Sequence, residues 1–201
     1  LSISQYTIDD GLSQTSVNCI IQDSQGFIWA GTQDGLNKFD GYSFKIYKYD
    51  PANINSLSNN FVNCIIEDAS GNIWIGTDEG LNKLNIYTNK ITRYLIDPGN
   101  VNTIPQNEIY DLYQDKQGYL WIKTENFLSR FDPEKEKFRH YEHYNDVFNF
   151  TSVNDKFSIF EDHKGQLWVG TKDGLNYFDR KLEIFKRYKH DPNDSKSLSN
   201  N

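Results

Sequence analysis

The stretch Gly71–Asn85 reads G-N-I-W-I-G-T-D-E-G-L-N-K-L-N, and the 201-residue chain contains three further copies of it. Close copies occur at Gly26–Asp40 and Gly165–Asp179, and a diverged copy occurs at Gly118–Asp132. Each copy contains one of the four tryptophans of the chain, spaced 45, 47 and 47 residues apart: Trp29, Trp74, Trp121 and Trp168. Self-similarity at a fixed period of this length indicates a repeat architecture.

The second copy predicts the strands of one structural unit, at Phe61–Glu67, Asn72–Thr77, Leu81–Asn85 and Ile91–Ile96. Between the first two strands, Asp68 and Gly71 occupy the first and fourth places of a turn, which is typical of type I. Between the next two, Gly80 is free to adopt a positive φ. Four short antiparallel strands in a repeat of this length are typical of a β-propeller blade.

The predicted fold class is therefore all-β, with four four-stranded antiparallel blades. We expect the blades at residues 11–50, 51–97, 98–141 and 142–201, the last range including the start of the next inter-blade loop. Residues 1–10 align with the fourth strands and resemble a strand that closes a propeller ring. The chain ends at Asn201, where earlier copies continue into another blade, so we expect an open partial propeller cut from a larger one.

The repeated residues have structural interpretations. Trp74 and Gly76 fall on one face of their strand, where a bulky residue beside a small one suits the stacking of one blade on the next. Cys19 and Cys64 occur at the same place in consecutive copies, so they should point in the same direction as two free, buried thiols. No metal-binding or cofactor motif is present in the sequence, and we expect neither a metal nor a cofactor.

Composition limits the partners of the chain. The net charge is −7 without a basic cluster, which argues against nucleic acid. A mean hydropathy of −0.73 without a long apolar run argues against a transmembrane helix and against direct membrane contact by this segment. No signal peptide is visible, although the chain begins at Leu1 rather than at a methionine.

The run I-W-[IAV]-G-T-x-[DE]-G-L-N-x-[FL]-[DN], preceded by D-x-x-G and by S-L-S-N-N before the first strand, resembles the two-component-regulator propeller repeat. The resemblance covers nearly the whole chain. It implies a periplasmic sensor domain of a Bacteroides-type hybrid two-component histidine kinase, with further blades and with kinase domains outside this chain. It also implies an oligosaccharide as the ligand. Because the motif describes the scaffold, it transfers no ligand-binding residue.

Two other functions are weighed against ligand sensing. A sialidase- or lyase-type enzyme is one, because D-x-x-G-x-x-W is similar to the Asp-box of sialidase propellers. The five arginines do not share an inner-strand position, however, and the repeated aspartates are better explained as turn caps. A protein-interaction propeller is the other, although the G-H and W-D signatures of WD repeats are missing. We therefore expect a non-enzymatic sensor segment.

The third copy departs most from the pattern. Drift in a tolerant repeat is one explanation, and a ligand site at this copy is the other. The long loops from fourth to first strands and the turns from second to third strands should share one edge of each blade. Functional residues often lie on such loops. The predicted ligand-binding residues, which offer hydrogen-bonding groups and aromatic faces, are Lys123, Asn126, Phe127, His143 and Tyr144.

An open arc would also leave its two terminal blade faces without a neighbour. Apolar patches of that size rarely persist on soluble monomers. We therefore expect self-association through the exposed blade faces.

Overall fold

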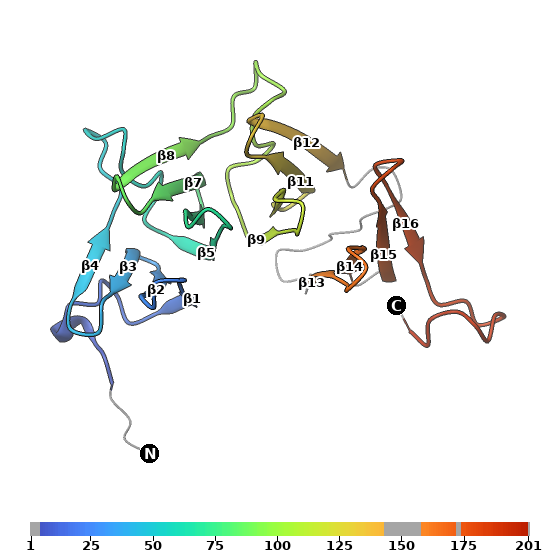
Figure 1. The fold of residues 1–201 in the computed structure, drawn as a ribbon, viewed down its shortest axis with the longest axis horizontal. Helices are drawn as coiled ribbons and strands as arrows, with labels where there is room; N and C mark the ends of the chain where they lie inside the picture. Colours follow the sequence, from blue (N-terminus) through green and yellow to red (C-terminus); the bar gives the residue numbers. More distant parts are fainter. Residues whose placement is uncertain (1–4, 143–157, 172–173, 201) are drawn as a thin grey trace.

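The structure is all-β and consists of four four-stranded antiparallel sheets, named blades 1 to 4 (Figure 1). It is a computed structural model that describes residues 5–142, 158–171 and 174–200. Blade 1 contains β1 (Val17–Gln22), β2 (Ile28–Thr32), β3 (Gly35–Phe39) and β4 (Phe44–Tyr47), and blade 2 contains β5 (Val62–Glu67), β6 (Ile73–Thr77), β7 (Gly80–Asn85) and β8 (Lys90–Tyr94). Blade 3 contains β9 (Asp111–Gln114), β10 (Leu120–Lys123), β11 (Phe127–Asp132) and β12 (Lys137–Glu142), and blade 4 contains β13 (Ser158–Glu161), β14 (Leu167–Thr171), β15 (Gly174–Asp179) and β16 (Ile184–Tyr188).

The blades stand side by side along an open arc, with blade 1 at one end and blade 4 at the other (Figure 1). In each blade the first strand lies on the inner side of the arc and the fourth strand on the outer side. Strand β5 contacts both β1 and β9, so blade 2 meets blades 1 and 3 along their inner strands. The predicted fold, a partial propeller of four-stranded blades, is confirmed.

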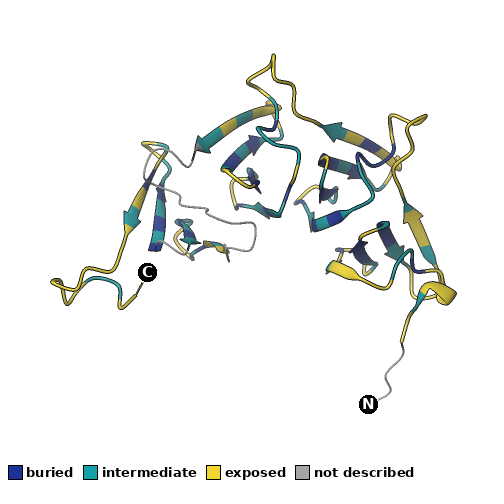
Figure 2. Ribbon diagram, turned by 180° about the vertical axis from the view of Figure 1, so that it is seen from behind, coloured by how far each residue is buried: buried dark blue, intermediate teal, exposed yellow. Residues whose placement is uncertain are grey.

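Burial is concentrated in the middle strands of the blades (Figure 2). All five residues of β6 are buried, whereas the outer strand β4 contains no buried residue. The outer strand has a neighbour on one edge only, so the middle strands contribute most of the core.

The tryptophans form the contacts between blades. Trp29, Trp74 and Trp121 are fully buried. The rings of Trp74 and Phe131, which belongs to the next blade, form an edge-to-face pair with their centroids 5.6 Å apart. Trp121 and Phe178 form the same kind of pair with a centroid distance of 5.0 Å. Edge-to-face pairs at these distances are favourable beyond the area that they bury. The interpretation of the tryptophans as core packing is confirmed for these three.

In blades 1 and 2, a glycine two residues after the tryptophan makes room for the next blade. A Cβ atom on Gly76 would lie 2.5 Å from Cys64 Sγ and 2.6 Å from the side chain of Ile109, which belongs to blade 3. Any side chain at Gly76 would therefore push Ile109 out of its position. Gly31 and Val62 have the same relation between blades 1 and 2.

A hydrogen bond between adjacent hairpins also repeats at each junction. The side chain at the end of a first strand accepts the N–H of the residue that follows the hairpin aspartate in the preceding blade. Glu67 accepts from Ser24 at 2.8 Å, Gln114 from Ala69 at 2.8 Å, and Glu161 from Lys116 at 2.7 Å. We call this bond the hairpin clasp.

The N-terminal segment differs from the prediction of a strand. Residues 5–7 have no regular structure, and Ile8–Asp10 form a 3-10 helix. A capping box explains the helix, because the Thr7 hydroxyl accepts from Asp9 N–H while the Asp10 carboxylate accepts from Thr7 N–H. Residues 1–4 lie outside the described part of the chain. In the described ranges, no helix is long and apolar enough to cross a membrane.

The two cysteines are free, as predicted. Cys64 is buried and Cys19 is half-buried. Burial raises the pKa of the Cys19 thiol to about 12, and it raises the pKa of Cys64 well above its ordinary value. Both groups are therefore protonated at neutral pH and act as small apolar side chains.

The terminal faces of the arc expose residues whose counterparts in the middle blades are covered. Ile20 of blade 1 is 64% exposed, whereas Ile65, its counterpart in blade 2, is 4% exposed. At the other end, Phe160 is 62% exposed and pairs across the sheet with the partly exposed Trp168. The exposed face of blade 1 thus corresponds to one half of an inter-blade contact, and the exposed face of blade 4 corresponds to the other half.

We propose that the 201-residue chain associates through these two faces, head to tail. Light scattering at micromolar concentration should give a mass above 23.5 kDa. Ile20→Glu should restore the monomer, because it places a charge in the apolar contact. Tyr42→Glu is the control, since Tyr42 is exposed on the β3–β4 turn. A monodisperse monomer for the unchanged chain would contradict the proposal.

Candidate functional site

The aspartate of each β-hairpin turn organises its own blade. In blade 2 one carboxylate oxygen of Asp68 accepts the N–H groups of Ser70 and Asn72 at 2.9 and 2.8 Å. The other oxygen accepts the indole N–H of Trp74 at 2.8 Å. The corresponding aspartate–indole distances are 2.8 Å in blade 1, 2.9 Å in blade 3 and 3.4 Å in blade 4. These carboxylates hold turns and tryptophans, so the geometry favours a structural role over a catalytic one.

The long loops and the turns between second and third strands lie at the same edge of the blades, as the strand polarity predicts. The N–H of Gly80 in the β6–β7 turn donates to the carbonyl of Asn107 in the next loop at 2.7 Å. Gly35 and Asn60 form the same bond at 2.8 Å one blade earlier. We call this side of the molecule the loop edge.

A buried amide connects each loop to its blade. Asn82 accepts the N–H of Ser58 at 2.9 Å and donates to its hydroxyl at the same distance. That hydroxyl also lies 3.0 Å from the Thr77 hydroxyl. Ser13, Asn37 and Thr32 repeat the arrangement in blade 1.

Blade 3 has lost this connection through two coupled changes. Pro105 stands where blade 2 has Ser58, and proline has no N–H to donate. Ser129 stands where blade 2 has Asn82, and its hydroxyl instead lies 2.8 Å from Nδ1 of His140. The substitution of Ser129 could be noted from sequence, but its relation to Pro105 and His140 depends on the register of the strands.

Three of the five predicted ligand-binding residues lie in or beside the β10–β11 turn at the loop edge. Asn126 is exposed, and its N–H donates to the Gln106 side chain at 2.9 Å. Phe127 is half-buried, with its ring 6.3 Å from that of His140. Lys123 differs from the expectation of a surface donor, because it is only 6% exposed. His143 and Tyr144 lie outside the described residues.

Lys123 and Asp111 form a charged pair of positions inside the sheet. They are directly opposite on β10 and β9, where blade 2 has Gly76 and Cys64. Burial raises the pKa of the Asp111 carboxyl, and the Leu112 N–H and the nearby Lys123 partly oppose that rise. Lys123 is therefore a buried residue at the end of β10, next to the exposed turn.

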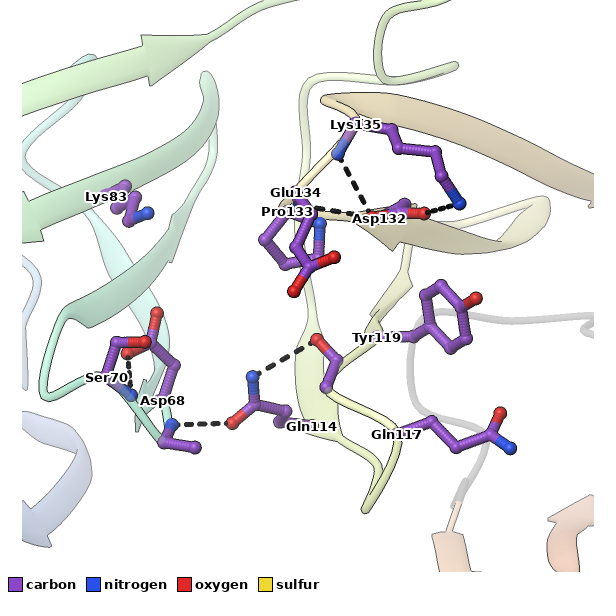
Figure 3. Close-up of a pocket in the computed structure, with 12 residues that line it drawn as sticks. Asp68, Ser70, Lys83, Gln114, Gln117, Tyr119, Asp132, Pro133, Glu134 and Lys135 are labelled. Carbon is purple, nitrogen blue, oxygen red and sulfur yellow. Dashed lines mark hydrogen bonds and ion pairs between the residues drawn. The ribbon is translucent and has the colours of Figure 1, made fainter.

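The opposite edge of the blades contains a groove that the sequence did not predict. Figure 3 shows the groove between the hairpins of blades 2 and 3, which encloses a cavity of about 310 Å³. Its polar lining comes from the turns and the adjoining strands of both blades and includes Asp68, Ser70, Lys83, Gln114, Gly118 and Glu134. We call it the hairpin groove.

Gln114 lies in the middle of the hairpin groove (Figure 3). Its carbonyl forms the hairpin clasp with Ala69, and its amide donates to the carbonyl of Gly118 at 3.3 Å. Lys135 pairs with Asp132 at 3.2 Å at the rim, and Lys83 lies over the Trp74 ring at 5.2 Å. The groove thus offers several acceptors close to the buried Asp68 carboxylate. In residues 5–142, 158–171 and 174–200, no cluster of three or more His, Cys, Asp or Glu could hold a metal ion.

Comparison with known proteins identifies the repeat. The family described as two component regulator propeller matches the chain four times, at residues 11–34, 56–79, 103–126 and 149–173. Over 53 residues the chain is 57% identical to a protein of Formosa agariphila named histidine kinase P4. The matched region makes up 26% of this chain and 4% of that protein.

Solved structures share the arrangement of the blades. The extracellular domain of a hybrid two component system of Bacteroides thetaiotaomicron matches 93% of this chain with 25% identity and a TM-score of 0.70, and the match spans 32% of that domain's chain. Virginiamycin B lyase of Staphylococcus aureus matches 91% of this chain and 58% of its own, with 14% identity and a TM-score of 0.66. The likeness to the lyase shows the fold alone.

The aspartate–tryptophan bond predicts unequal effects of one substitution in two blades. Asp68→Ala should lower the free energy of unfolding by about 2–4 kcal/mol, because it removes hydrogen bonds to a charged acceptor and leaves a buried indole N–H without a partner. Asp162→Ala should have a clearly smaller effect, since its Trp168 bond is longer and that ring is partly exposed. Urea unfolding of both variants measures the difference. Equal losses would contradict the role given to the indole bond.

Proposed function

Because this chain consists of two-component regulator propeller repeats, we propose that it is part of the ligand-sensing periplasmic domain of a sensor histidine kinase. The observation that carries the proposal is the match of 93% of the chain to the extracellular domain of a hybrid two component system. The 57% identity to part of a histidine kinase supports the same assignment. In this proposal the chain itself is not an enzyme.

The proposed ligand is an oligosaccharide, bound at the loop edge of blade 3. Asn126 and the ring of Phe127 are accessible in the β10–β11 turn, and they offer a hydrogen-bonding amide beside an aromatic face. Lys123 contributes positive charge from beneath the turn, and it would have to move outward to touch a ligand. His143 and Tyr144 complete the proposed set. Such a mixture of stacking surfaces and placed polar groups is common in ligand sites.

Sensing would work through the contacts between blades. Since blades 2 and 3 share a continuous core, a ligand that ordered the β10–β11 turn would favour one arrangement of that core over another. The N–H of Asn126 is bound to Gln106, which lies in the loop that leads from blade 2. The proposal therefore connects the site to the junction of blades 2 and 3 through one loop.

The proposal is tested in the intact receptor with a reporter of kinase output. Alanine substitution of Asn126 or Phe127 should raise the oligosaccharide concentration needed for half-maximal signalling at least tenfold, with smaller effects for Lys123, His143 and Tyr144. Glu79→Ala is the matched control, because Glu79 occupies the same place in the β6–β7 turn of blade 2.

Unchanged signalling in all five variants would contradict the proposed ligand site but not the proposed sensing role. Binding of a protein partner together with no response to any glycan fraction would instead favour the protein-interaction alternative. Turnover of a glycan by the purified chain would favour an enzyme.

A further inference from the structure

The junction between blades 3 and 4 contains an arginine that fills its groove. The guanidinium of Arg180 donates to the Asp115 carboxylate at 2.9 Å, to the Gln117 side chain at 2.7 Å and to the Gly165 carbonyl at 3.1 Å. A fourth bond, of 3.3 Å, reaches the carboxylate of Glu161. The Asp115 and Glu161 side chains are almost completely buried, so Arg180 neutralises two carboxylates that are shielded from water.

Each of these acceptors has a counterpart 47 residues earlier, at the junction of blades 2 and 3. The counterparts are Asp68 for Asp115, Ser70 for Gln117, Gly118 for Gly165 and Gln114 for Glu161. All four line the hairpin groove. The counterpart of Arg180 is Pro133, whose short ring has no hydrogen-bond donor.

The position of Arg180 is therefore occupied by a different kind of residue at each of the three junctions. Between blades 1 and 2 the corresponding residue is Ile86, which packs against the core cluster around Trp29 and Ile73. Between blades 3 and 4 it is Arg180. Between blades 2 and 3 it is Pro133, and there a cavity of about 310 Å³ remains.

We propose that the hairpin groove binds a guanidinium group supplied from outside the chain. The group would take the place of the Arg180 guanidinium, with donors directed at the Asp68 carboxylate, the Ser70 hydroxyl and the Gly118 carbonyl. The Asp68 carboxylate is shielded from water, which strengthens its attraction for a cation. A planar guanidinium suits this set because its donors point in several fixed directions.

Gln114 sets the strength and the specificity of the site. It is neutral where Glu161 is charged, and its amide now donates to Gly118. An incoming guanidinium must displace that 3.3 Å bond and also the Asn72 side-chain amide, which donates to both Asp68 carboxylate oxygens at 3.1 and 3.0 Å. Binding should therefore be weaker than the internal contact of Arg180. The Glu134 carboxylate at the rim adds negative charge that disfavours a free carboxylate next to the guanidinium, whereas the Asp132 carboxylate is paired with Lys135. We therefore expect an arginine side chain within a peptide to bind better than free arginine.

The test follows the indole N–H signals of the 201-residue chain by NMR during titration with methylguanidinium. The Trp74 signal should shift in a saturable manner, because its N–H is bonded to Asp68, while the Trp29 signal should not. Tetramethylammonium, a cation without N–H donors, should leave both signals unchanged. Acetyl-arginine amide and L-arginine are then compared to distinguish a peptide source from a free amino acid.

Two variants show whether the groove is the site. Pro133→Arg should fill the groove from within and abolish the shift, whereas Pro133→Ala should keep it. Adding Gln114→Glu to Pro133→Arg should raise the melting temperature above that of either single variant, because it recreates the pair formed by Glu161 and Arg180. No saturable shift of Trp74, or a shift that persists in the folded Pro133→Arg variant, would overturn the proposal. Since the groove lies at the edge opposite the β10–β11 turn, either result leaves the proposed oligosaccharide site untouched.

Discussion

The hydrogen bond between a hairpin aspartate and a tryptophan indole is the constraint on which the rest of the structure depends. One carboxylate closes the turn between the first two strands and fixes the ring that the next blade packs against. Without a partner, the indole N–H would be costly to bury, so the bond allows the tryptophan of blades 1, 2 and 3 to lie fully inside. Local turn chemistry and blade stacking are thereby joined in one interaction.

The contacts at each junction follow from this arrangement. The tryptophan meets an aromatic or aliphatic residue of the next blade, and the hairpin clasp fixes the turns to each other. In blades 1 and 2 the nearby glycine also admits a β-branched side chain, whereas blade 3 has Lys123 at this place. These contacts are apolar or consist of one or two hydrogen bonds between adjacent blades. A stack built in this way tolerates substitution at one junction without loss of the others, which is the behaviour expected of repeat proteins.

Function is to be sought where the junctions differ. Blade 3 replaces a glycine with Lys123, a cysteine with Asp111 and a connecting amide with Ser129, so its loop edge is held by other groups than in blades 1 and 2. At the opposite edge, Pro133 leaves open a space that Ile86 and Arg180 occupy elsewhere. Both features involve blade 3, one at each end of the same sheet.

The sequence by itself determined the period, the four strands of each blade, the hairpin turns and the structural use of the tryptophans. These follow from local rules, because strand length, turn residues and alternation of side chains are encoded within about ten neighbouring residues. The tertiary structure decided the rest. The burial of Lys123, the relation of Ser129 to His140 and the hairpin groove all depend on side chains brought together from different strands or blades. The 3-10 helix at Ile8–Asp10 was not predicted either, because the alignment of residues 1–10 with the fourth strands indicated a strand. The Thr7 and Asp10 side chains form hydrogen bonds with the local backbone and so favour the helix.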